Sequence, residues 1–261
     1  MGDDSFISFK TRFGGMPYCE GCADSGALFY SYEVGPLHVL ALSAYEDLSP
    51  ESLQTRFLEA DLAAVNRTRT PWVLTCWHPP VYNSNEKHYL EHEAFRLAYE
   101  PLLLAARVNI AMTGHVHGFQ RTKMVANNEV VQAGGIYHWM VGMGGKELCV
   151  GGAGACRGAR ALRTARSHCR AIHSPPHPSP AHKYTRRYRT WREPLTDYPW
   201  VAARDATFWG YSVLTVHNAT TACVDVICSA GDTCADGDVI DRACFENQLI
   251  ALGEMPASLT V

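Results

Sequence analysis

The pattern of apolar and polar residues predicts a strand, a helix and a second strand in the middle of the chain. Trp72–Trp77 and Val108–Met112 are short apolar runs, rich in β-branched or aromatic residues, which is typical of buried strands. Between them, apolar residues recur on one face of Glu91–Ala106, which predicts a helix with a kink at Pro101. Such a unit usually places its two strands parallel in one sheet.

The residues before this unit predict a hairpin and a helix. Leu28–Val34 and Leu37–Ser43 are rich in strand-forming residues and are separated by a turn. Ser49 followed by proline is typical of a helix start, so we expect Ser49 to be the N-cap of a helix that ends near Asn66. The alternation of strands and helices indicates an α/β layered fold.

The residues after the unit predict further strands. We expect them at Phe119–Met124, Val130–Gln132, Tyr137–Val141, Ala206–Asn218 and Thr221–Cys228. Asn127-Asn128 predicts a turn between the first two, and Asn218–Thr220 predicts a turn between the last two. The sequence after Cys244 carries no clear pattern.

Histidines follow both central strands. His78 comes directly after the first strand, and His115 and His117 follow the second. The carboxyl ends of parallel strands meet at one edge of a sheet, and residues two apart point the same way along an extended backbone. We therefore expect the three imidazoles to converge, as metal ligands do. The alternative for any one of them is a histidine that is satisfied in the core or in a loop.

These residues resemble a known family. His78-Pro-Pro-Val-Tyr-Asn-Ser, His88 and Gly114-His-Val-His-Gly-Phe-Gln-Arg together resemble motifs of the purple acid phosphatases, a branch of the metallophosphoesterases. The resemblance implies an αββα sandwich of the metallophosphoesterase type, truncated at its N-terminal side. It also implies hydrolysis of phosphomonoesters, which is acid phosphatase activity, at a centre of Fe(III) with Zn, Mn or Fe(II).

The resemblance also implies roles for single residues. His78 and His115 would bind the divalent metal, and His117 would bind the ferric ion. His88 would orient the phosphate and protonate the leaving group. Asn83 would contact the substrate from the polar stretch Asn83–Lys87, which we expect to fold over the site.

Other motifs of the family do not occur in the sequence. GDxG, GDxxY and GNHE supply its remaining ligands, and the chain begins about where GNHE would end. Three neutral histidines bring no negative charge to offset two cations, so we expect impaired catalysis and a single weakly held zinc ion. The alternatives are a non-catalytic metal- or phosphate-binding remnant, an incomplete gene model, or an interaction module built on the cysteine-rich end.

Composition and charge limit the expected partners and cellular location of the protein. A net charge of −3 and a pI near 6.4 give no overall signal for nucleic acid or membrane, so we expect a phosphomonoester partner and leave a homodimer open. Ten cysteines and glycosylation sequons at Asn66 and Asn218 favour a secreted or vacuolar protein, although no apolar signal core begins this chain. The alternative is chance sequons and free thiols.

Composition also predicts the division of the chain. Residues 1–150 would form the C-terminal part of the catalytic domain, and residues 193–261 its closing strands with a cysteine-rich tail. Residues 151–192 contain no acidic side chain and are rich in arginine, proline and histidine, except at their apolar start. We expect a poorly ordered insertion there. A basic arm for nucleic acid or membrane and a metal-binding histidine tract are alternatives.

Overall fold

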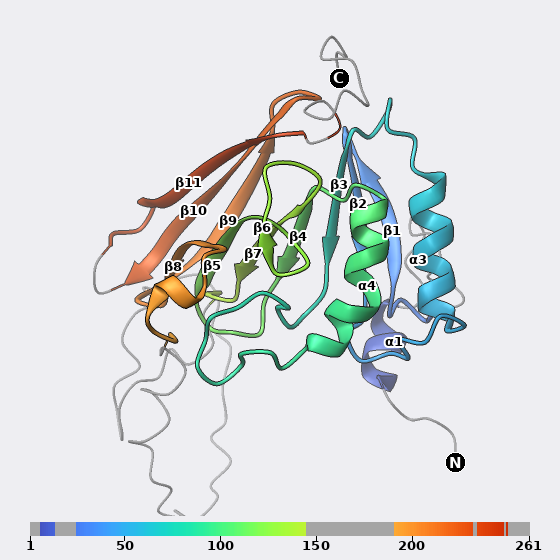
Figure 1. Cartoon of the computed structure of the whole chain (residues 1–261), viewed down its shortest axis with the longest axis horizontal. Helices are drawn as coiled ribbons and strands as arrows, with labels where there is room; N and C mark the ends of the chain where they lie inside the picture. The colour runs from blue at the N-terminus through green and yellow to red at the C-terminus, as the bar shows by residue number, and fades with distance from the viewer. Residues whose placement is uncertain (1–5, 14–24, 145–190, 232–233, 248, 250–261) are drawn as a thin grey trace, which may run out of the picture.

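The computed structural model describes residues 6–13, 25–144, 191–231, 234–247 and 249 (Figure 1). Two sheets pack on one another, and helices cover the outer face of the larger sheet. The helices are α1 (Ile7–Phe13), α3 (Leu53–Ala64), α4 (Glu93–Ala105) and the short 3-10 helix η2 (Leu195–Asp197). The α/β class that the sequence predicts is therefore confirmed. The described helices lie on the outer face of the larger sheet.

In the described part of the chain, the larger sheet is eight-stranded and mixed. Its strands are β1 (Tyr30–Val34), β2 (Leu37–Ala41), β3 (Trp72–Cys76), β4 (Ile110–Thr113), β5 (Phe119–Ala126), β6 (Glu129–Val130), β7 (Ile136–Val141) and β8 (Val201–Asp205). The order is β1-β2-β3-β4-β7-β5-β6, and β8 pairs with β5. Strands β2, β3, β4 and β7 are parallel neighbours, so their carboxyl ends share one edge of the sheet.

The smaller sheet has the order β11-β10-β9. Its strands are β9 (Phe208–Val216), β10 (Thr221–Gly231) and β11 (Val239–Glu246). The hairpin between β9 and β10 is confirmed, whereas β11 was not predicted. Disulfides tie this region together: Cys223 and Cys244 lie opposite one another on β10 and β11 and are bonded, and Cys228 is bonded to Cys234.

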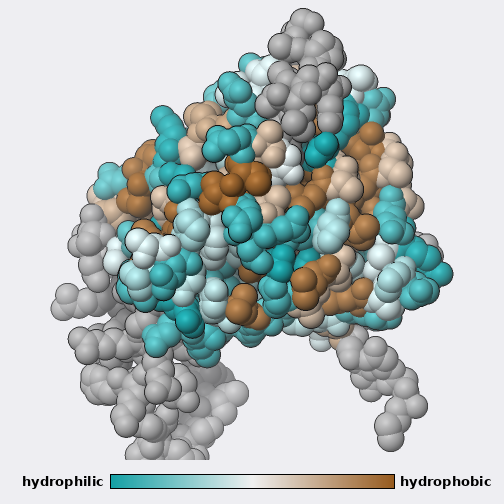
Figure 2. All heavy atoms as spheres, in the orientation of Figure 1, coloured by the Kyte–Doolittle hydropathy of each residue, from teal (hydrophilic) through white to brown (hydrophobic). Residues whose placement is uncertain are grey.

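Two apolar cores hold the layers. Leu58 of α3 and Tyr99 of α4 pack on the helical side of the large sheet. Trp72, Trp139 and Phe245 are among the largest side chains of the core between the sheets. Burying a large apolar side chain stabilises a fold by roughly 1.5–3 kcal/mol, so each core is a major source of stability. On the surface, hydrophobic side chains gather in several separate areas divided by hydrophilic ones (Figure 2).

The central unit has the predicted arrangement. Strands β3 and β4 are parallel, with Leu74 opposite Ile110, and α4 connects them with Pro101 inside the helix. The predicted hairpin is also present, because β1 and β2 are antiparallel neighbours. Asn127 and Asn128 form the turn between β5 and β6, with φ values of 51° and 67°. These conformations are those of a hairpin turn that asparagine tolerates well.

The predicted cap of the second helix is wrong. Ser52, not Ser49, is the N-cap of α3, since its hydroxyl accepts a hydrogen bond from the Thr55 N–H at 3.0 Å. The N–H and the hydroxyl of Ser49 both donate to the Asp47 carboxylate, at 2.9 and 2.8 Å. The nearby carboxylate therefore holds Ser49 in a turn that precedes the helix.

Some predictions fall outside the described residues. The arginine-rich segment 151–192 does so except for its last two residues, and the division of the chain at 150 and 192 stays a prediction. Among the helices that the structure describes, none is long and apolar enough to cross a membrane.

Candidate metal centre

The candidate site lies where two parallel strands end. His78 is two residues beyond β3, and Gly114 directly follows β4. The Gly114 N–H donates to the His78 carbonyl at 2.8 Å, so the two loops are joined through their main chains. The shared edge of the sheet thus brings the histidine loops together, as the sequence predicts.

The loop around His115 is a tight turn rather than an extended strand. His115 has a φ of +63°, and the N–H groups of Val116 and Gly118 donate to carbonyls only two residues back, at 2.7 and 2.8 Å. The expectation of an extended backbone through His115 and His117 was therefore wrong. His117 is half-buried two residues further along this turn.

A glycine of a neighbouring strand supports this turn. Gly142 follows β7, and its N–H donates to the Gly118 carbonyl at 3.1 Å. A Cβ placed on Gly142 would lie 1.8 Å from the Val116 carbonyl oxygen, far inside contact distance. The histidine loop can therefore take this position only because residue 142 has no side chain.

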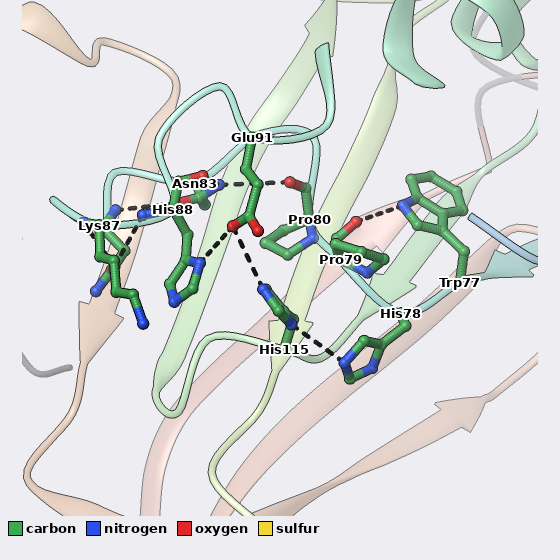
Figure 3. Close-up of polar contacts among 10 residues, drawn as sticks. Trp77, His78, Pro79, Pro80, Asn83, Lys87, His88, Glu91 and His115 are labelled. Atoms are coloured by element: carbon green, nitrogen blue, oxygen red, sulfur yellow. Dashed lines mark hydrogen bonds and ion pairs between the residues drawn. The ribbon is translucent and has the colours of Figure 1, made fainter. Parts of the chain in front are cut away.

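Three predicted site residues lie together with one that the sequence reading missed (Figure 3). His115 Nδ1 is 3.2 Å from His78 Nε2, and His115 Nε2 is 3.3 Å from Glu91 Oε2. The same carboxylate oxygen is hydrogen-bonded to Nδ1 of His88. Ligand atoms of His88, Glu91 and His115 all lie within 4.8 Å of one another, close enough to gather around one ion.

Glu91 was missed because the pattern of apolar residues assigned it to a helix. Helix α4 begins only at Glu93, so Glu91 belongs to the preceding turn and its half-exposed carboxylate reaches the histidines. His92 also lies beside the site, with its ring centroid 6.3 Å from that of His115. The run His88, Glu91, His92 is a signal of metal-ligating residue types that sequence reasoning could have used.

The electrostatics of the site favour the neutral forms of His78 and His115. Burial lowers the pKa of His78 and of His115, and the charge of a neighbouring histidine lowers each further. Burial alone would raise the pKa of Glu91. The hydrogen bond to His88 and the charges of His88 and His115 outweigh burial and hold that pKa below its ordinary value. Metal ions bind the neutral form of an imidazole and the ionised form of a carboxylate, which are the forms favoured here.

Asn83 shapes the loop beneath His88. It is 2% exposed, and its side-chain amide donates to the His88 carbonyl at 2.9 Å while its oxygen accepts from the Asn85 N–H at 3.1 Å. These bonds place the main chain of His88. The contact of Asn83 with a substrate stays a prediction.

Hydrogen bonds to other parts of the chain hold the stretch Asn83–Lys87 in place. Both the N–H and the hydroxyl of Ser84 donate to the side-chain oxygen of Gln120, at 3.0 and 2.7 Å. Arg204 of β8 donates to the Ser84 hydroxyl at 2.8 Å. Buried polar contacts therefore fix this stretch on two strands. Our expectation that it folds over the site stays a prediction.

Tyr45 forms an exposed aromatic border of the site. Its ring centroid is 6.5 Å from that of His78 and 6.3 Å from that of His92. The side chain is 56% exposed, so it offers a flat apolar surface next to the histidines.

Comparisons with known proteins agree with the motif resemblance. No family model matches the chain. Its sequence is 43% identical over 142 residues, 54% of the chain, to "Purple acid phosphatase 18" of Arabidopsis thaliana. It is also 43% identical over 141 residues to "Purple acid phosphatase 22" of the same plant. Each match covers 32% of the relative, so the chain spans about a third of the length of the curated relatives it matches.

The fold of a solved structure is also similar. The purple acid phosphatase PPD1 from yellow lupin (Lupinus luteus) seeds matches 89% of this chain with a TM-score of 0.59 at 20% sequence identity. The match covers 35% of the lupin chain. The resemblance to purple acid phosphatases that the sequence predicts is thereby confirmed, and the fold is shared.

Proposed function

We propose that this chain supplies the histidine side of a metal-dependent acid phosphatase that hydrolyses phosphomonoesters. The observation that carries the proposal is a cluster at the shared edge of the parallel strands. His88 and His115 contact the Glu91 carboxylate there, and His78 contacts His115. The similarity to named purple acid phosphatases supports the same reaction class.

The residues present fit a divalent metal. His78 Nε2 and His115 Nδ1, 3.2 Å apart, have the separation of two ligands that share one ion with metal–nitrogen bonds of about 2.0–2.1 Å. Glu91 would accept the Nε2 proton of His115, which directs the Nδ1 lone pair towards the ion. When bound, the ion would polarise a phosphoryl oxygen and supply positive charge.

A second arrangement competes for His115. His88, Glu91 and His115 could instead surround one ion through Nε2 of His115, a two-histidine and one-carboxylate set that zinc accepts. A neutral imidazole has only one unprotonated nitrogen, so His115 binds an ion in one arrangement or the other. We favour the His78 arrangement because it leaves the Glu91–His88 pair intact for proton transfer.

In this proposal His88 donates a proton to the leaving group. Glu91 engages Nδ1 of His88, so the proton for the leaving oxygen would come from Nε2. The Glu91 carboxylate stabilises the protonated imidazole and fixes its orientation. Tyr45 would hold the organic part of the ester beside the histidines.

The set of metals is part of the proposal. By resemblance, His117 would serve a second, ferric ion in a two-metal centre. The motifs that supply the acidic ligands of such a centre are not among these 261 residues. Glu91 adds one negative charge that the sequence reading did not include, and this charge offsets half of that of one divalent ion. We therefore propose that residues 1–261 alone hold one zinc ion and hydrolyse phosphomonoesters slowly.

The proposed location is the secretory pathway, with a secreted or vacuolar destination. Two disulfides within the smaller sheet and its loop fit an oxidising compartment. Asn66 and Asn218 are both exposed at turns, and each accepts a hydrogen bond of 2.6 Å from the threonine hydroxyl of its sequon. Both asparagines are thus accessible for glycosylation.

Metal stoichiometry and hydrolysis test the proposal. We would load the protein with zinc or iron and measure bound metal and turnover of an aryl phosphate near pH 5. His78→Ala and His115→Ala should lose the zinc ion, whereas the matched control His217→Ala, at an exposed histidine, should keep it. Unchanged zinc content in His78→Ala, with loss in His88→Ala, would establish the competing arrangement. Two tightly bound metals with a purple colour would refute the single ion.

A further inference from the structure

Gln120 is a buried amide close to the histidine loops. It is the second residue of β5, three residues after His117, and is 1% exposed. It belongs to the histidine motif Gly114–Arg121, but the proposed phosphatase function gives it no role. An amide in the core needs partners for both its oxygen and its nitrogen, because a buried polar group without a partner is costly.

These partners lie in the stretch that leads to His88. Gln120 Oε1 accepts hydrogen bonds from the N–H and the hydroxyl of Ser84, at 3.0 and 2.7 Å. Gln120 Nε2 donates to the Tyr82 carbonyl at 3.1 Å. The oxygen and the nitrogen of the amide thus hold different residues, which fixes the orientation of the amide. Gln120 therefore fixes the main chain of this stretch relative to β5.

Two asparagines connect this stretch to His88. Asn85 is 0% exposed, and its Oδ1 accepts from the His88 N–H at 3.3 Å. The Asn83 amide donates to the His88 carbonyl at 2.9 Å, so side chains hold both main-chain groups of His88. The two asparagines flank Ser84, the residue that Gln120 holds. A displacement of Ser84 would therefore move the main chain of His88 as well.

Other hydrogen bonds hold Ser84 in the same place. Its carbonyl accepts from the Arg192 N–H at 2.7 Å, and its hydroxyl accepts from Arg204 of β8 at 2.8 Å. Arg204 is in turn paired with Glu193. Because the N–H, the hydroxyl and the carbonyl of Ser84 are all bonded, the residue moves only when several hydrogen bonds break. Gln120 accepts two of these bonds.

The position of His88 matters for the reaction. The residue is 7% exposed, its Nδ1 is bonded to Glu91, and its ring centroid lies 4.5 Å from that of His115 (Figure 3). A general acid must lie within hydrogen-bond reach of the leaving oxygen, roughly 2.6–3.2 Å. A misplacement of about 1 Å can lower the rate about 100-fold. The group that fixes the main chain of His88 therefore controls the reach of its Nε2.

We propose that Gln120 is the positioning residue for His88. It acts through its hydrogen bonds to Tyr82 and Ser84 and does not contact the substrate. This inference rests on the proposed function, in which His88 protonates the leaving oxygen. Esters whose leaving oxygen needs a proton should therefore depend on Gln120, whereas esters whose leaving group departs as a stable anion should not.

Hydrolysis of two esters by the zinc-loaded protein tests the proposal. The alcohol of glycerol phosphate needs a proton to leave, whereas the phenol of dinitrophenyl phosphate leaves as an anion. Gln120→Met keeps the length of the side chain but removes its three hydrogen bonds. It should lower kcat for glycerol phosphate about 10-fold, a part of the roughly 100-fold cost of losing a general acid, and lower kcat for the dinitrophenyl ester less than about 2-fold. Equal losses for the two esters would overturn the proposal.

A conservative variant tests which bonds matter. Gln120→Glu keeps an acceptor for both bonds from Ser84 and loses only the donor to the Tyr82 carbonyl. It should therefore retain most of the activity towards glycerol phosphate that Gln120→Met loses. A loss in Gln120→Glu as large as that in Gln120→Met would show that the bonds from Ser84 do not position His88.

Gln54 of α3 offers a matched control. It is also 1% exposed, and its amide is bonded to the main chain of Ser43 and to the Tyr99 hydroxyl. Gln54→Met should lower the stability to denaturant about as much as Gln120→Met. The ratio of the two kcat values should stay unchanged, because Gln54 has no bond to the His88 stretch. A changed ratio in Gln54→Met would overturn the assignment to Gln120.

Amide hydrogen exchange gives a readout that needs no activity. In Gln120→Met the His88 N–H should exchange about 10-fold faster, because the stretch that holds it opens more readily. Unchanged exchange would overturn the positioning of His88 by Gln120. If the unmutated protein hydrolyses neither ester, the phosphatase proposal fails, and with it the general-acid role of His88. Exchange in that case still measures whether Gln120 orders the loop, so the two failures are distinguishable.

Discussion

Two polar clusters meet helix α4 (Glu93–Ala105), one in its middle and one just before its start, and they differ in how their charges are matched. In the middle cluster, Arg96 lies between Glu93 and Glu100, and Glu100 also accepts from the Tyr82 hydroxyl at 2.6 Å. The cluster before the helix consists of Glu91 and the surrounding histidines. The charges of the first cluster are matched within the protein, whereas the second has several imidazoles around a single carboxylate.

The middle cluster is paired on all sides. Arg96 donates to both oxygens of Glu93, at 2.9 and 2.5 Å, and to Glu100 at 2.5 Å. The hydrogen bond to Glu93 raises the pKa of Arg96, and burial raises the pKa of Tyr82. Every charge here has a partner, which is the mark of a structural network.

The cluster before the helix has one carboxylate for several imidazoles. Burial lowers the pKa of His78, His92 and His115, so they carry lone pairs rather than protons near neutral pH. The difference between the clusters shows that a count of charged residues does not identify a site. What distinguishes the candidate site is a group of neutral imidazoles gathered around a single carboxylate.

Removing the centre of the paired cluster should have the largest effect. Arg96→Met leaves the buried Glu100 carboxylate without its counter-ion, so we expect a loss of about 3–5 kcal/mol in the free energy of unfolding. Denaturant unfolding measures it. The exposed pair of Arg242 with Asp225 is the control, and Arg242→Met should leave stability nearly unchanged. A similar loss in both variants would contradict the comparison.

Replacing His88 tests the general-acid role that we propose for the cluster before the helix. In an active form of the enzyme, His88→Ala should lower kcat about 100-fold, the usual scale for loss of a general acid, with less effect on metal content. Steady-state kinetics and metal analysis of the same sample give both numbers. If metal falls in parallel with kcat, His88 is a ligand.

His138 of β7 adds to the comparison a buried histidine that lies outside the candidate metal centre. Its ring is buried 4.6 Å from the Tyr82 ring, and burial lowers its pKa to about 3. The folded protein therefore binds fewer protons than the unfolded chain between about pH 6.5 and pH 3. Within that window stability should fall with falling pH, by up to about 1.4 kcal/mol per unit.

His138→Phe should remove this pH dependence. The measurement is the midpoint of denaturant unfolding for both proteins at pH 7, 6 and 5. Identical slopes against pH would mean that His138 titrates alike in both states.

The smallest effect should come from the carboxylate that links the histidines. Glu91→Gln keeps the size of the side chain but removes its charge, so zinc affinity should fall about 10-fold, as for other outer partners of metal-binding histidines. Competition with a zinc chelator measures the affinity. Complete loss of zinc would instead identify Glu91 as a direct ligand.

Local patterns were sufficient for much of the fold. The run Trp72–Cys76 and the turn at Asn127 have strong sequence signals, and both are present. Strand β11 was missed because charged residues such as Asp241 and Arg242 interrupt its alternation. Only pairing with β10 makes Val239–Glu246 a strand. The cap of α3 was misplaced because Asp47, two residues before Ser49, holds the Ser49 N–H and hydroxyl in a local turn.

The site was less predictable for a related reason. The strand ends place His78 and His115 together, which topology alone predicts. The reach of Glu91 depends on where helix α4 starts, and helix boundaries are weakly encoded. The turn at His115 depends on a left-handed backbone conformation and on the neighbouring strand, neither of which a period-two pattern contains.

The contact at Gly142 means that one main-chain position controls the shape of the histidine turn without a side chain of its own. In a screen of all substitutions, position 142 would score as an essential catalytic residue, although a glycine has no group that could react. Any side chain there displaces the Val116 carbonyl and with it the turn that carries His115. Tolerance to substitution around this centre therefore depends on how closely the main chains at Gly142 and Val116 approach, as well as on the side chains of the cluster.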